Sequence, residues 1–95
     1  MIHYIESPLW GKLVSRMIRA EMILKGMKYK DIHESLLSLG THQSVGNLRQ
    51  KIHRGQMSAQ LFLQLMIVLE MDQLSVNSLN DKIRRLQSEL NGKAD

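Results

Sequence analysis

Apolar residues recur every three or four positions along most of this chain, a spacing that places them on one face of an α-helix. The first such run follows Ser7 and Pro8, a pair that favours a helix start because serine caps free backbone amides and proline fits the first turn. The run stops near Gly26, and glycine commonly ends helices. The pattern therefore predicts a helix over about residues 8–25.

Two shorter amphipathic runs follow. One covers about residues 29–39 and closes at Gly40, and the other covers about residues 44–54 and closes at Gly55. The second of these places three apolar residues on one stripe, namely Val45, Leu48 and Ile52. Its other positions are polar, so we expect a short helix with one buried face and one exposed face.

The fourth run, about residues 59–71, is apolar on most sides, which is typical of a helix at the centre of a core. A buried strand is the alternative, but about twelve residues without glycine or proline favour a helix. A fifth run, ended by Asn91 and Gly92, predicts a helix over about residues 76–91. Its apolar residues alternate steps of three and four and form a seam of Val76, Leu79, Ile83, Leu86 and Leu90.

The five runs predict an all-α protein, with one compact domain over residues 1–72 and a C-terminal helix within residues 73–95. The 95 residues are 43% hydrophobic but only 4% aromatic, so the core must rest on aliphatic residues and methionine, which suits helices better than sheets.

Several classes of chemistry are not expected. The chain has no cysteine, which excludes disulfides, thiolate zinc sites and a cysteine nucleophile. None of its four histidines pairs with another at a spacing of four, so we expect neither a metal nor a cofactor; they are His3, His33, His42 and His53. Asp31 and Glu34 lie three apart, as a paired acid and base would, but solvated surface charges are the simpler interpretation. With no glycine-rich phosphate loop and no Ser-His-Asp grouping, we expect no enzyme.

The chain also lacks the signals of membrane insertion and export. No apolar stretch approaches the roughly 20 residues that span a bilayer, and residues 1–7 do not resemble a secretory signal. We therefore expect a cytoplasmic protein without a membrane partner. Thirteen Lys and Arg residues against nine Asp and Glu give a formal charge of +4, which favours a polyanionic partner, although a merely solvated basic surface is the alternative.

The polar face of the third predicted helix carries the most specific chemistry. On a helical wheel, four residues lie opposite the apolar stripe: Gln43, Asn47, Gln50 and Arg54. Asparagine and glutamine can bind adenine through two hydrogen bonds, and arginine can bind guanine in the same way. Gly46 would let this helix approach a sugar-phosphate backbone closely. An ordinary surface helix with solvated amides is the alternative.

The order of these elements resembles the helix-turn-helix domains of the Cro and phage-repressor type, over about 40–60 residues. The chain is also similar to a small bacterial family of uncharacterised helix-turn-helix proteins, through Asn47, Leu48, Lys51, Arg54 and Gly55. The resemblance implies that the second helix spans the DNA backbone and that the third is the recognition helix.

From the resemblance and the polar face together, we expect base contacts from Asn47, Gln50 and Arg54. Backbone contacts are expected from Gln43, Ser44, Lys51, Lys28, Tyr29 and Lys30. The last three begin the second helix, where the helix dipole also favours anions.

The sequence departs from the repressor pattern at three places. His33 stands where alanine usually allows close helix contact, the stretch through Leu39 and Gly40 is longer than the usual tight turn, and His53 replaces a frequent glutamate.

The leading hypothesis is a sequence-specific regulator of transcription of bacterial or mobile-element genes that binds double-stranded DNA as a homodimer. A two-fold dimer reads two half-sites about 34 Å apart, and the seam of the fifth helix is the expected dimer interface; its folding back over its own core is the alternative. A helical adaptor that binds another protein is the second hypothesis. RNA binding is a weaker one, because the chain lacks interleaved aromatic residues that stack on unpaired bases.

Overall fold

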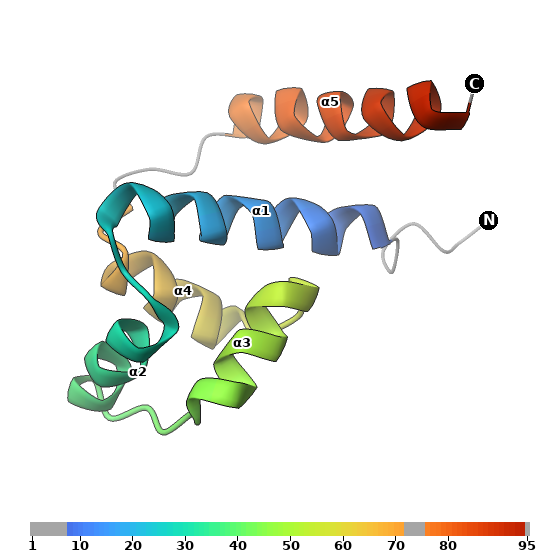
Figure 1. Ribbon diagram of the computed structural model, residues 1–95. Helices are drawn as coiled ribbons and strands as arrows, with labels where there is room; N and C mark the ends of the chain where they lie inside the picture. The colour runs from blue at the N-terminus through green and yellow to red at the C-terminus, as the bar shows by residue number, and fades with distance from the viewer. Residues whose placement is uncertain (1–7, 72–75, 95) are drawn as a thin grey trace.

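The computed structural model describes residues 8–71 and 76–94, and within them every regular element is an α-helix (Figure 1). Five helices follow one another along the chain: α1 (Pro8–Lys25), α2 (Tyr29–Ser38), α3 (Val45–Arg54), α4 (Ala59–Val68) and α5 (Val76–Ala94). The all-α class expected from the sequence is thereby confirmed. Figure 1 shows α2, α3 and α4 grouped on one side of α1, with α5 along its other side.

The main core lies between α1, α2, α3 and α4. Its buried residues come from the apolar stripes of these helices and from the cap of α4: Ile18, Met22, Ile32, Leu36, Leu48, Ile52, Leu61, Leu65 and Leu69. The fourth run is indeed a helix, but it ends at Val68 and not near residue 71 as predicted. Leu69 remains in the core as the C-terminal cap, and the positive φ of 53° at Glu70 then turns the chain away.

The ends of α3 and α4 follow the capping residues in the sequence. Ser44 Oγ accepts a hydrogen bond from the backbone amide of Asn47 at 3.0 Å, and Ser58 Oγ accepts one from the amide of Leu61 at 3.1 Å. These bonds satisfy amides that a helix start would otherwise leave unpaired. Gly55 closes α3 in the left-handed conformation, with φ 67°.

Two glycines set how closely α3 approaches α1. A methyl group on Gly11, in α1, would lie 2.6 Å from the carbonyl oxygen of Arg54. A methyl group on Gly55 would lie 2.7 Å from the carbonyl carbon of Gly11 and 2.9 Å from its Cα. Real Cβ atoms do not come this close to backbone atoms, so the C-terminal end of α3 can rest on α1 only because both positions lack a side chain.

The fifth helix packs against α1 and forms a second, smaller core. Ile83 and Leu86 are 7% and 3% exposed and contact Leu13 and Met17 of α1, with Leu79 packed at the edge. Arg16 Nη1 also binds Glu89 Oε2 at 3.0 Å. The side chains of Val76 and Leu90 lie outside the described part of the chain.

These contacts bear on the expected dimer seam. Its described residues are covered within a single chain, which is the fold-back alternative, so a second copy cannot use them while α5 holds this position. The helix also continues through Asn91 and Gly92 to Ala94, so these two residues do not end it as predicted. An isolated glycine costs a helix only about 1 kcal/mol.

Candidate nucleic-acid interface

Helix α3 buries one face and presents the other to solvent. Leu48 and Ile52 are fully buried, whereas the three expected base-contact residues, Asn47, Gln50 and Arg54, are all exposed. Within residues 8–71 and 76–94, the side chains of these three residues form no hydrogen bond or ion pair. Their donors and acceptors therefore point outward without an internal partner.

The electrostatic character of this region is uniformly basic. The chain contains no acidic residue from Ser35 to Leu69, a stretch that includes the loop before α3, the whole of α3 and α4. The cations within it all belong to α3: Arg49, Lys51 and Arg54. Helix α3 therefore offers a cationic surface that no neighbouring carboxylate in its own sequence neutralises.

The loop between α2 and α3 is held by two polar contacts, and these account for two of the departures from the repressor pattern. His33 Nδ1 donates to the carbonyl oxygen of Gln43 at 2.6 Å. Thr41 Oγ1 donates to Gln64 Oε1 of α4 at 3.0 Å. The end of the longer loop therefore binds back to His33 of α2. This hydrogen bond holds the residues just before α3 in place, as a tight turn would in the repressor pattern.

Two of the expected backbone-contact residues lie next to each other. Lys51 Nζ donates to Gln43 Oε1 at 3.1 Å, and both side chains are half-buried. This bond orients the ammonium group and leaves its other protons available, since an ammonium has three. Ser44 is exposed, but its Oγ already caps α3, so only its hydroxyl proton remains for a ligand.

The start of α2 brings the other three expected backbone contacts beside α3. Lys28 and Lys30 are exposed, and Tyr29 is half-buried. The guanidinium carbon of Arg49 lies 5.3 Å from the centroid of the Tyr29 ring, a cation–π geometry that joins the first turn of α2 to the middle of α3. The Asp31 side chain turns back toward the start of α2, and its Oδ2 accepts a hydrogen bond from the backbone amide of Lys28 at 2.8 Å.

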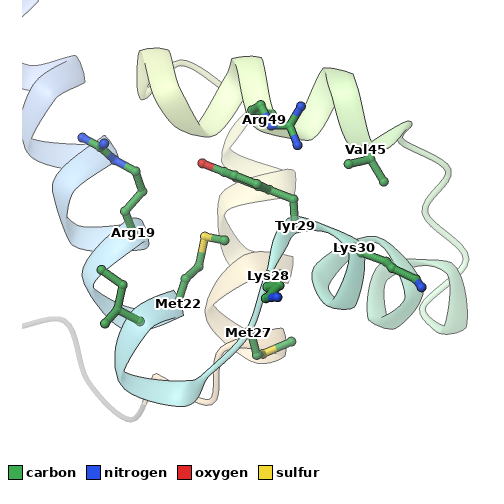
Figure 2. Close-up of a pocket in the computed structure, with 9 residues that line it drawn as sticks. Arg19, Met22, Met27, Lys28, Tyr29, Lys30, Val45 and Arg49 are labelled. Carbon is green, nitrogen blue, oxygen red and sulfur yellow. The ribbon is translucent and has the colours of Figure 1, made fainter.

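A groove of about 490 Å³ opens between α1, α2 and α3 (Figure 2). Four cationic side chains line it: Arg19, Lys28, Lys30 and Arg49. No acidic residue is among the described residues that line it.

Arg49 and Arg19 were not expected as site residues. Arg19 carries no distinguishing mark in the sequence. Arg49 does lie in α3, but its place at the groove depends on its contact with Tyr29, twenty residues earlier, and therefore on how α2 crosses α3. Among residues 8–71 and 76–94, no group of three or more metal-ligating side chains occurs, and His3 lies outside these residues.

The comparisons with known proteins identify a family but no function. Residues 10–74 match the model of a domain of unknown function, DUF6471. The matched segment includes most of α1 and all of α2, α3 and α4, and it ends before α5. No curated protein and no solved structure matches the chain. In the part of the chain that the structure describes, no helix is long and apolar enough to cross a membrane.

Proposed function

The chain belongs to the DUF6471 family, whose match covers more than half of it, and we propose that it is a sequence-specific DNA-binding protein that regulates transcription. In this proposal α3 enters the major groove of double-stranded DNA and acts by binding, without catalysis. Asn47, Gln50 and Arg54 read base edges. Gln43, Ser44, Lys51 and the first turn of α2 hold phosphates.

The observation that carries the proposal is the set of polar side chains on the exposed face of α3 that have no partner among the described residues. Two amides and a guanidinium point outward without internal partners, on a helix with no acidic residue. An ordinary solvated helix mixes both signs of charge, because ion pairs within the helix add stability. Exposed amides and cations on one short helix instead match the donors and acceptors of purines in the major groove.

The surroundings of α3 support the same proposal. The Lys51 ammonium is oriented by Gln43 on one flank, and the Tyr29–Arg49 stack joins α2 on another. Cations held in this way on both sides of α3 can bind DNA phosphates. Phosphate contacts position a protein on the duplex without reading its sequence.

A first experiment selects bound sites from random duplex DNA and then measures affinity by fluorescence anisotropy. Gln50→Ala should weaken binding to the selected site by about 1–3 kcal/mol and leave binding to random DNA nearly unchanged, because base contacts determine which sequence is preferred. Gln60→Ala, which removes an exposed amide from α4, is the matched control and should change neither. Failure to enrich any sequence, or an equal loss on both duplexes, would refute base reading by Gln50.

Lys51→Ala tests the phosphate contacts. If Lys51 binds phosphate, affinity should fall on all sequences, and the slope of log affinity against log salt should drop by about one contact. Lys82→Ala, in α5, removes the same charge from an exposed position elsewhere and is the control. An unchanged slope would show that Lys51 serves only to hold Gln43.

A second function, a helical adaptor for another protein, rests on a different observation. Helix α4 exposes Leu63 and Ile67, one turn apart, and α4 has no charged residue. Apolar exposure of this kind marks some protein interfaces. A salt titration separates the two functions, because DNA affinity falls steeply with salt through counterion release and an apolar contact changes little.

Binding as a homodimer is part of the proposal and follows from the size of the recognition helix. One short helix reads few base pairs, and two copies on half-sites about 34 Å apart would double the contacts. The described residues of the α5 seam, Leu79, Ile83 and Leu86, pack against α1 within one chain, so this pairing would need another surface or a displaced α5. The number of chains bound per duplex, from analytical ultracentrifugation, tests it, and a single chain on the full selected site would contradict it.

A further inference from the structure

We infer that the groove between α1, α2 and α3 binds a small amphipathic anion, with an apolar aromatic body and one sulfonate, carboxylate or phosphate group, and that this anion competes with DNA. The competition rests on the proposed function, whereas the binding of the anion does not.

The charge of the groove selects an anion. Arg19 comes from α1, Lys28 and Lys30 from the N-cap and first turn of α2, and Arg49 from α3, so cationic residues of three helices line the same groove. Glu21 and Asp31 adjoin lining residues in the sequence, but neither lines the groove, and Asp31 accepts a hydrogen bond from the backbone amide of Lys28. Four cations around one cavity without a counter-charge attract a negatively charged group.

The apolar part of the groove is not explained by DNA. Met22, Met27 and Val45 line it, together with Ile23, which is 82% exposed. Phosphate contacts need surface cations and backbone amides, not an apolar lining. Cavities that hold small molecules have volumes of about 300–1,000 Å³ and combine a mostly apolar lining with a few polar groups, and this groove of about 490 Å³ has both features.

The Tyr29 ring supplies a flat surface inside the groove. In Figure 2 it lies between Arg19, from α1, and Arg49, from α3. Arg49 already stacks over this ring at 5.3 Å. A planar anion can therefore contact an aromatic ring or a guanidinium plane while its acidic group binds one of the cations.

The groove and the DNA surface share residues, which is why we expect competition. Lys28, Tyr29 and Lys30 line the groove and are also the proposed phosphate contacts on α2, and Arg49 belongs to α3 itself. An anion bound there neutralises the cations that DNA would use. Because binding linkage is reciprocal, DNA must weaken anion binding by the same factor.

The test uses 8-anilinonaphthalene-1-sulfonate as the probe and the full chain as the protein. Fluorescence should saturate at one probe per chain. Ile23→Glu places a carboxylate at the groove. It should lower the affinity for the probe by about tenfold or more, because the carboxylate repels the sulfonate and an apolar contact is lost. Leu24→Glu is the matched control, since Leu24 is 73% exposed on the next position of α1 and does not line the groove. It should change affinity by less than about twofold, because its carboxylate lies in solvent outside the groove, where water weakens the interaction between charges and no apolar contact with the probe is lost.

Three further measurements complete the test. Circular dichroism melting must show both variants folded, so that the probe does not report an unfolded core. N-phenyl-1-naphthylamine, which lacks the sulfonate, should bind far more weakly than the probe. The selected duplex should displace the probe from the parent chain.

Each result decides one part. An equal loss in both variants, fluorescence without saturation, or equal binding of the uncharged analogue would overturn the anion site. Saturable binding that a bound duplex does not displace would overturn the competition. A chain that binds the probe but no DNA would refute the proposed function and the competition with it, and would leave the anion site standing.

Discussion

The contact between Gly11 and Gly55 allows a prediction with an internal control. Gly55→Ala introduces a methyl group within 2.9 Å of the Gly11 backbone, at a residue whose φ is 67°. Gly26→Ala makes the same change at nearly the same φ, 66°, but no atom lies within 4 Å of the new methyl group. The two variants share the strain of the left-handed conformation and differ in the crowding against α1.

The structure sets the magnitudes. The left-handed conformation costs a residue with a side chain roughly 1–2 kcal/mol, and this term applies to both variants. Crowding in a packed region adds roughly 1–3 kcal/mol, and it applies to Gly55→Ala alone. We expect a loss of about 1–2 kcal/mol for Gly26→Ala and about 2–5 kcal/mol for Gly55→Ala. For a domain of this size, about 1 kcal/mol corresponds to 4–8 °C in Tm.

Urea unfolding followed by circular dichroism measures both losses. Trp10, the only tryptophan of the chain, precedes Gly11 and is part-exposed, so its fluorescence should change in Gly55→Ala and stay unchanged in Gly26→Ala. Gly11→Ala should also destabilise, although alanine favours helices, because its methyl group would meet the Arg54 carbonyl at 2.6 Å. Equal losses for Gly26→Ala and Gly55→Ala would refute the close approach of α3 to α1.

Three further predictions follow. Gly46→Ala should raise stability by about 0.5–1 kcal/mol, because Gly46 is an exposed helical position with open space around it; the same change should weaken DNA binding if α3 lies close to the duplex, and unchanged affinity in anisotropy would contradict that. Ser44→Ala should cost about 1 kcal/mol in urea unfolding through loss of the α3 cap, and a loss near zero would show that the cap is dispensable. Ile83→Asp with Leu86→Asp should release α5 from α1 and leave the main core folded, because burial of unpaired charge costs more than the small cluster contributes; α5 amides should then lose protection in hydrogen exchange, and a dimeric parent converted into a monomer whose α5 stays protected would instead favour an intermolecular seam.

The sequence predicted the helices well because their boundaries depend on local chemistry. Ser44 and Gly55 act within one turn of themselves, and they mark the two boundaries of α3 as expected. The end of α4 was placed too late because the apolar run continues through Leu69, and nothing in the local sequence announces the positive φ at Glu70. Local signals therefore sufficed at Ser44 and Gly55 but failed at Gly92, through which α5 continues.

The sequence predicted which residues of the site are exposed on one helix, but not the contacts between helices. The wheel identified Asn47, Gln50 and Arg54 as an exposed face, because exposure follows from the position of the buried stripe. It could not show that Arg49 stacks on Tyr29, because that contact depends on the crossing of two helices. A regular seam likewise shows which face of a helix is buried but not which surface covers it.

The division of the core has a consequence for how the molecule comes apart. Helix α1 turns Leu13 and Met17 toward α5, and Ile18 and Met22 toward the main core, so the two clusters share a helix but no buried residue. One polar contact between α5 and α1 is the Arg16–Glu89 pair, whose side chains are half-exposed and which adds little at an exposed site. The amides of α5 should therefore exchange with solvent through a local opening of low free energy, while those of α2, α3 and α4 require the main core to unfold. The protein should in this sense unfold as two cooperative units on one shared helix, and the unit that carries the candidate interface should keep its own core when α5 leaves.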